Sequence, residues 1–171
     1  MLTIHPYRPE DAQIIAPWIR DRDTMHRLAA NLYDSFPVTA EMMNAAYDNY
    51  STTHTFLPFT VTDENNVLCG HFTYLFRKDE PDTARICFVI VDDSRRGQQL
   101  GTQMMQLAVR YAREELHAGK ISLCVFANNP AAHRCYLSVG FRDLEPVRQV
   151  PIMGGTWDCI DMVWDPSCQW N

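Results

Sequence analysis

A loop in the second half of the chain reads Val91-Asp92-Asp93-Ser94-Arg95-Arg96-Gly97-Gln98-Gln99-Leu100-Gly101-Thr102. Residues 84–91, which end at the first residue of this loop, are rich in β-branched and aromatic side chains and predict a buried strand. Beyond Gly101, apolar residues recur at three- and four-residue spacing as far as Gly119, which predicts an amphipathic helix. The loop is therefore expected to join the end of a strand to the start of a helix.

Such a junction suits a phosphate group, because the first N–H groups of a helix lack partners within it and the aligned dipoles make that end positive. Gly97 and Gly101 allow a ligand to approach the backbone closely, and Arg95 or Arg96 adds charge. A plain connecting turn with solvated arginines is the alternative. The loop has neither the Gly-Lys-Ser/Thr of a Walker loop nor a G-x-G-x-x-G fingerprint, so those nucleotide sites are not predicted.

The rest of the chain predicts alternating strands and helices. Strands are expected at residues 2–7, 56–62, 67–76, 121–127, 141–150 and 156–164, and helices after an Asp11 cap, near Thr39 and from Pro130. The strand at 84–91, the helix after the loop and the strand at 121–127 form a βαβ unit, which places the two strands parallel and adjacent. No repeat or linker is visible, so residues 1–171 are expected to form one α/β domain.

Composition narrows the classes of partner and location. The formal net charge is -6, which argues against nucleic acid as a partner, and no apolar run is long enough to span a membrane. The six cysteines contain no C-x-x-C pair and are expected to be reduced thiols. No export signal opens the chain, so a cytoplasmic location is expected.

The loop resembles the acetyl-CoA loop of the GNAT N-acetyltransferase superfamily. That pattern is Arg or Gln, two residues, Gly, one residue, then Gly or Ala, and Arg96 and Gly101 match its ends. Gln99 stands where the family usually has its first glycine, and its backbone N–H can still donate a hydrogen bond.

A second match follows the loop in the family's order. The family pattern is Asn, two residues, Ala, three residues, Tyr, three residues, Gly-Phe. All five marked positions are present, as Asn129, Ala132, Tyr136, Gly140 and Phe141. The chain therefore resembles the superfamily at two independent motifs.

The resemblance implies a GNAT fold, an α/β fold in which a mixed central sheet is splayed around the CoA site with helices on both faces. It implies transfer of an acetyl group from acetyl-CoA to a primary amine by direct attack in a ternary complex. The acceptor would be a small-molecule amine or the N-terminal or lysine amine of a protein, and the enzyme a monomer or homodimer. A CoA-binding regulatory or interaction module that has lost turnover is the alternative.

The resemblance also assigns site residues. Those implied to bind CoA are Ile90, Val91, Arg96, Gly97, Gln98, Gln99, Leu100, Gly101, Thr102, Asn129 and Tyr136. The N–H of Val91 would face the thioester oxygen, and Tyr136 would act as general acid for the departing thiolate. Tyr136 as a core tyrosine and Asn129 as a simple helix cap are the alternatives.

The sequence leaves the general base open, because residues 84–91 contain no carboxylate. His71 is the leading candidate, with a structural histidine as its alternative, and Glu80, Asp82 or Asp92 could also serve. Cys87 is not expected to carry the acyl group, since no His and carboxylate partners are evident.

Two further expectations concern ligands. The acidic residues of the segment expected to choose the substrate could attract a cationic amine, although a solvated acidic face is the favoured explanation; they are Asp21, Asp23, Asp34 and Glu41. The His and Cys pairs at 69 and 71 and at 133 and 135 do not have zinc-site spacing, so no metal is expected.

Overall fold

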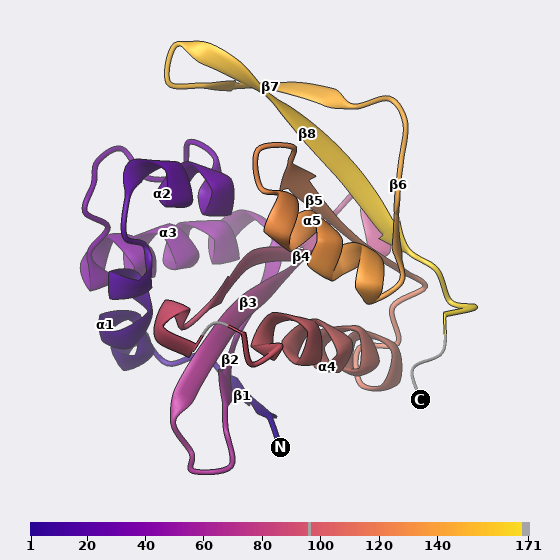
Figure 1. The fold of residues 1–171 in the computed structure, drawn as a ribbon, viewed down its shortest axis with the longest axis horizontal. Helices are drawn as coiled ribbons and strands as arrows, with labels where there is room; N and C mark the ends of the chain where they lie inside the picture. The colour runs from indigo at the N-terminus through magenta and orange to yellow at the C-terminus, as the bar shows by residue number, and fades with distance from the viewer. Residues whose placement is uncertain (96, 169–171) are drawn as a thin grey trace.

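The structure is a computed structural model that describes residues 1–95 and 97–168. A mixed sheet forms its centre and helices lie on both of its faces (Figure 1). The strands are β1 (Thr3–Pro6), β2 (Thr55–Thr62), β3 (Leu68–Arg77), β4 (Glu80–Val91), β5 (Lys120–Phe126), β6 (Phe141–Asp143), β7 (Arg148–Ile152) and β8 (Gly155–Trp164). The α-helices are α1 (Ala12–Ile15), α2 (Arg22–Ala29), α3 (Ala40–Thr53), α4 (Leu100–Glu114) and α5 (Pro130–Ser138).

The two groups of helices cover opposite faces of the sheet. Successive side chains of a strand point to opposite faces, and in β2 Phe59 and Val61 pack in the cluster that contains α4, whereas Phe56 packs in the cluster that contains α3. Helices α1 to α3 therefore lie on one face, and α4 with α5 on the other. No helix within the described ranges is both long enough and apolar enough to cross a membrane.

The strand order is β1-β2-β3-β4-β5-β8-β6, with β7 paired to β8. The pair β4–β5 is parallel and is joined by α4, as the βαβ pattern predicts, and the other pairs of the sheet are antiparallel. The mixed sheet of the expected fold class is thus confirmed.

The sheet opens between β4 and β5. The two strands pair at only three positions, the last of which joins Arg85 to Ser122. Beyond it, β4 continues to Val91 and β5 to Phe126 without pairing with each other, while β5 stays paired with β8 along its other edge. A bulge in β4 adds to the divergence, because Phe88 has a φ of 51° and the register with β3 shifts there. The result is a wedge whose vertex lies at Arg85.

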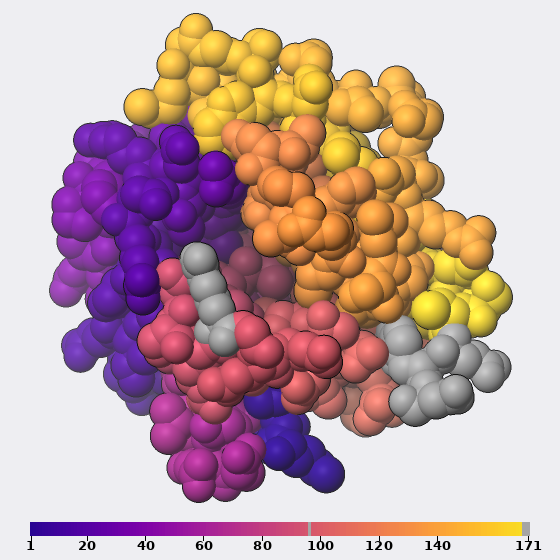
Figure 2. All heavy atoms as spheres, viewed as in Figure 1, coloured from indigo at the N-terminus to yellow at the C-terminus, as the bar shows by residue number. Residues whose placement is uncertain are grey.

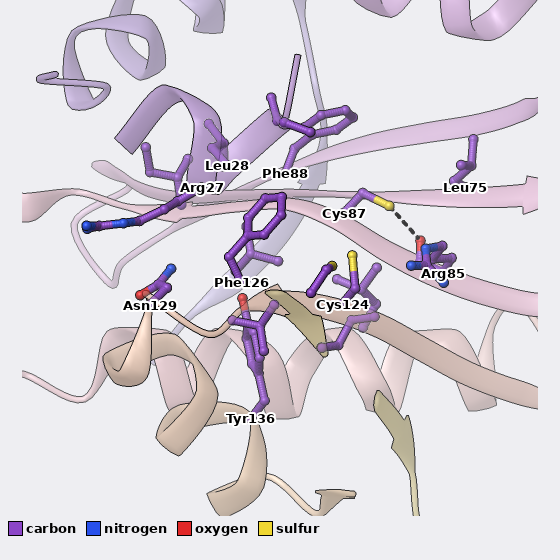
Figure 3. Close-up of a pocket in the computed structure, with 18 of the residues that line it drawn as sticks. Arg27, Leu28, Leu75, Arg85, Cys87, Phe88, Cys124, Phe126, Asn129 and Tyr136 are labelled. Atoms are coloured by element: carbon purple, nitrogen blue, oxygen red, sulfur yellow. Dashed lines mark hydrogen bonds between the residues drawn. The ribbon is translucent and has the colours of Figure 1, made fainter. Parts of the chain in front are cut away.

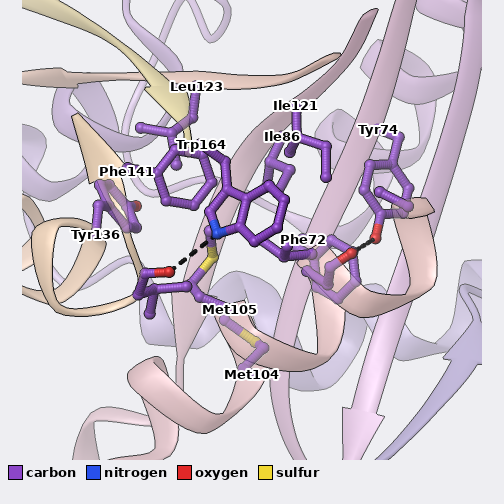
Figure 4. Packing of buried hydrophobic residues seen from close by; sticks show 14 of the residues in the cluster. Phe72, Tyr74, Ile86, Met104, Met105, Ile121, Leu123, Tyr136, Phe141 and Trp164 are labelled. Atoms are coloured by element: carbon purple, nitrogen blue, oxygen red, sulfur yellow. Dashed lines mark hydrogen bonds between the residues drawn. The ribbon is translucent and has the colours of Figure 1, made fainter. Parts of the chain in front are cut away.

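A packed core holds α4 and α5 against the sheet (Figure 4). The Tyr74 hydroxyl donates to the carbonyl of Ala108 in α4 at 2.5 Å, and Trp164 Nε1 donates to the carbonyl of Val139 after α5 at 3.1 Å. Both bonds satisfy polar atoms that would be costly to bury unpaired. They tie α4 to β3 and the end of α5 to β8.

Three predicted elements differ from the structure. The expected helix after Asp11 is broken into short turns around α1, because Pro17 lacks the N–H that a continuous helix needs. Asp11 does not cap it with its side chain, which instead accepts from the N–H of Arg8 at 2.9 Å. Strand β4 begins at Glu80 rather than at residue 84, and the strand expected at 141–150 is divided into β6 and β7.

Candidate active site

A cavity of 430 Å³ lies in the wedge (Figure 3). Strand residues 85–90 and 123–126 form two of its walls, α2 closes it on one side and α5 on the other. The molecular surface is hollowed between the N-terminal helices and α5 (Figure 2). The cavity is therefore bounded by elements from both faces of the sheet and is large enough for a small ligand.

Tyr136 reaches this cavity from α5. Its side chain is buried in the core beside Phe141, and its hydroxyl points into the wedge (Figure 3). Burial raises the pKa of the phenol well above its usual value, because the phenolate would lose hydration. The hydroxyl therefore stays protonated at neutral pH and can donate a proton or a hydrogen bond.

Asn129 lies at the end of the cavity where β5 ends and α5 begins (Figure 3). It caps α5, because its Oδ1 accepts from the N–H of Ala132 at 3.3 Å. The structure thus confirms the capping role and also places the residue at the cavity.

Val91 ends β4 beside the wedge, and Ile90 lines the cavity itself. The N–H of Asp92 donates to the carbonyl of Cys69 at 2.9 Å. Antiparallel strands alternate hydrogen-bonded and non-bonded pairs, so Val91, opposite Gly70, directs its N–H away from β3. The Val91 N–H therefore points to the open side of β4. This is the side on which the sequence predicts a hydrogen-bond donor to the thioester oxygen.

The loop before α4 has the conformation of a glycine-rich turn. Gly97 has a φ of 81° and Gln99 a φ of 56°, so both residues are left-handed. The first amide bonded within the helix is that of Gln103, which donates to the carbonyl of Gln99 at 3.0 Å. The N–H groups of residues 100–102 therefore precede the helical ladder and have no hydrogen-bond acceptor within it.

Of the two arginines in the loop, the structure describes only Arg95. Arg95 Nη1 lies 2.9 Å from Asp63 Oδ2, so its charge is paired with that carboxylate. Arg96, the residue that matches the start of the family pattern, lies outside the described residues.

Gln99→Gly should be tolerated or mildly stabilising. A non-glycine residue in the left-handed region carries a strain of roughly 1 kcal/mol, which glycine relieves, although glycine also makes the unfolded chain more flexible. Thermal unfolding should show an unfolding free energy equal to that of the wild type or up to about 1 kcal/mol higher. A clear destabilisation would mean that the Gln99 side chain makes a contact that the fold requires.

His71 does not line the cavity. It is buried in β3, and its Nε2 is hydrogen-bonded at 2.7 Å to the hydroxyl of Tyr47 from α3. Burial lowers the pKa of the imidazole from 6.5 to about 3, because the charged form would lose hydration. The ring is therefore neutral at physiological pH and packed among aromatic rings, which fits a structural histidine rather than a general base.

His71 should make the fold sensitive to acid. Its pKa is lower in the folded state, so the unfolded chain binds the extra proton, and stability present above pH 6.5 is lost as the pH falls toward 3. The expected contribution is about 1.4 kcal/mol per pH unit within that window. Denaturant titrations at several pH values give the free energy of unfolding as a function of pH. Between pH 6.5 and 3, the slope of this dependence should be shallower by this amount in His71→Gln, which keeps an acceptor for Tyr47. Equal slopes would contradict the assignment.

The other candidate bases also lie outside the cavity. Glu80 and Asp82 stand at the start of β4, beyond the vertex of the wedge, and Asp92 accepts from the N–H and hydroxyl of Ser94. Among the described residues that line the cavity, no Asp or Glu is present. The structure therefore places Tyr136 and Asn129 at the same cavity, and the four candidate bases lie outside it.

Sequence reasoning missed the polar groups at the vertex. Arg85 Nη2 donates to Asp161 Oδ1 at 3.0 Å, and Arg148 Nη2 donates to the same oxygen at 2.9 Å. A hydrogen bond with Cys159 and the charge of Arg85 lower the pKa of the Cys124 thiol. Arg85 is the lone charged residue within residues 84–91, and that isolation was the signal available in the sequence.

Comparison with known proteins identifies the family to which the chain belongs. The sequence model of the Acetyltransferase (GNAT) family matches residues 22–141. A search of curated proteins found no match.

Solved structures share the fold. A spermidine N-acetyltransferase from Vibrio cholerae, in complex with CoA and spermine, is similar with a TM-score of 0.77 at 21% identity, covering 95% of this chain and 94% of that one. A putative phosphinothricin N-acetyltransferase is similar with a TM-score of 0.75 at 17% identity, covering 98% and 99%. With a family match over most of its length and the splayed sheet described above, the chain belongs to the acetyltransferase (GNAT) family, whose acyl donor is acetyl-CoA.

Proposed function

We propose that this chain transfers an acetyl group from acetyl-CoA to a small-molecule primary amine by direct attack in a ternary complex. The observation that carries the proposal is the cavity in the wedge, with the protonated Tyr136 hydroxyl directed into it from α5.

The residues beside the wedge fit the acyl donor. The N–H groups of residues 100–102 at the start of α4 would bind the diphosphate, where the helix dipole favours negative charge. The N–H of Val91 would donate toward the thioester oxygen, and Ile90 and Asn129 would flank the pantetheine arm. Gln99 in its left-handed conformation takes the part of the missing glycine.

The chemistry needs little beyond placement. The neutral amine attacks the thioester carbon, the new C–N bond forms, and the C–S bond breaks with its electron pair left on sulfur. Tyr136 donates a proton to that sulfur, the excess proton of the amine passes to solvent, and the Tyr136 oxygen takes a proton back from solvent before the next turnover. We do not assign His71 as the base, because its ring is buried outside the cavity and is too weakly basic.

Release of free thiol from acetyl-CoA tests the proposal. A panel of small amines and a lysine-containing peptide should yield thiol above the rate without an acceptor for at least one small amine. Mass spectrometry should find the acetylated product. CoA that raises the melting temperature while no acceptor promotes thiol release would instead support the binding-module alternative, and release confined to the peptide would exclude a small-molecule acceptor.

A further inference from the structure

The charges that line the cavity are positive. Arg27 of α2 and Arg85 of β4 both contribute to its lining, at opposite ends (Figure 3). No acidic side chain of the described residues lines it. A ligand in this cavity therefore meets guanidinium groups without a carboxylate facing it.

Arg85 is held in place at the vertex of the wedge. Its side chain is 25% exposed and is bonded to Asp161, which is shared with Arg148. Asp161 is therefore shared by two guanidinium groups, and the other acidic group beside Arg85 is the Cys124 thiol, whose pKa is lowered by a hydrogen bond with Cys159 and by the charge of Arg85. A guanidinium has five N–H donors in a planar fork, so the bond to Asp161 leaves donor capacity for an anionic group.

The acidic residues expected to draw a cationic amine do not reach the cavity. Asp21 accepts from the N–H of Thr24 as the cap of α2, and Asp23 lies 3.9 Å from Arg27 on the outer surface. Asp34 and Glu41 are also absent from the lining. Among the described residues of the lining, no Asp or Glu is present to compensate a second positive charge on the acceptor.

The two ends of the cavity have different neighbours. Arg27 lies toward Asn129, at the end nearest to the proposed site of the acyl donor (Figure 3). Arg85 lies at the opposite end, where β4 and β5 are still paired and where no part of the donor is placed. Arg85 is therefore available to the acceptor.

We propose that the acceptor amine carries a carboxylate, and that this group pairs with Arg85 while the amine lies near the Tyr136 hydroxyl. The inference rests on the proposed acyl transfer and narrows its substrate class to amino carboxylates. A charge-assisted, planar pairing of carboxylate with guanidinium supplies both affinity and orientation.

Three acceptors of equal chain length test the charge preference. They are γ-aminobutyrate, butylamine and putrescine, whose far ends are anionic, neutral and cationic; leucine with leucinamide repeats the comparison for α-amino acids. In at least one series the carboxylate should have a kcat/KM at least about 10-fold above its neutral analogue. A preference for putrescine or for the neutral amines would overturn the inference and leave the transferase proposal intact, whereas no transfer to any amine would overturn both.

Arg85→Gln tests the residue. It should lower kcat/KM for the carboxylate by about 10- to 100-fold, leave the neutral amine and the KM of acetyl-CoA nearly unchanged, and keep Asp161 paired through Arg148. Arg85→Lys should retain part of the preference. Arg77→Gln, which removes an exposed arginine bonded to Asp79 outside the cavity, is the matched control. Equal losses for all acceptors in Arg85→Gln would contradict a role in recognising the carboxylate.

Discussion

Tyr136→Phe is expected to lower kcat at least about 100-fold and to leave the affinity for acetyl-CoA within about twofold, because general acid catalysis contributes at least about that factor. The variant keeps the ring that packs against Phe141 and removes only the hydroxyl in the wedge. The thiolate then departs without a nearby proton donor. Steady-state thiol release measures kcat, and calorimetry measures the binding of acetyl-CoA.

Tyr33→Phe is the matched control for the loss of a buried tyrosine hydroxyl. Tyr33 is buried but lies outside the cavity lining, so its variant should retain wild-type turnover. Undiminished turnover in Tyr136→Phe would remove the acid assignment. Equal losses of turnover and of acetyl-CoA affinity would point to a binding role instead.

Gly101→Asp is expected to weaken acetyl-CoA binding at least about 100-fold, since juxtaposed like charges cost several kcal/mol. The new carboxylate would stand in the first turn of α4, where the diphosphate is proposed to bind. The fold should tolerate it, because a Cβ at this position meets only Cys135 Sγ at 3.6 Å and an acidic residue favours a helix N-terminus.

Gly101→Asp should lose affinity for acetyl-CoA without losing stability. Thermal unfolding of Gly101→Asp should show a melting temperature equal to or above that of the wild type, while titration shows the loss of affinity. Gly101→Asn adds a side chain of nearly equal size without the charge and should lose much less. Unchanged affinity in Gly101→Asp would exclude the start of α4 as the diphosphate site.

Local patterns predicted the part of the fold that surrounds the loop. The βαβ unit could be predicted because the buried strand, the amphipathic helix and the next strand each carry their own periodicity. Helix α2 could not be predicted in the same way, because it is short and its apolar residues are few. The start of β4 was missed because Glu80 and Asp82 are exposed polar residues on a strand that has only β3 beside it there.

The site could be predicted only where a motif marks it. Tyr136 and Asn129 reach the cavity because their spacing within α5 is fixed by the helix and its cap. The bond between Arg85 and Asp161 joins residues 76 positions apart, and a single sequence carries no local signal for it. The surroundings of His71 likewise depend on α3 packing over β3, which sets the burial that lowers its pKa.

The short pairing of β4 with β5 leaves two interior edges within one sheet. Strand edges with unpaired main-chain groups ordinarily attract another strand, and proteins must protect them. Here α2 and α5 flank the space on either side, and a slender chain with amide groups would fit between the strands and supply part of the missing ladder. Under the proposed function, the pantetheine arm would serve as that surrogate strand, and donor binding would bring together the two halves of the sheet.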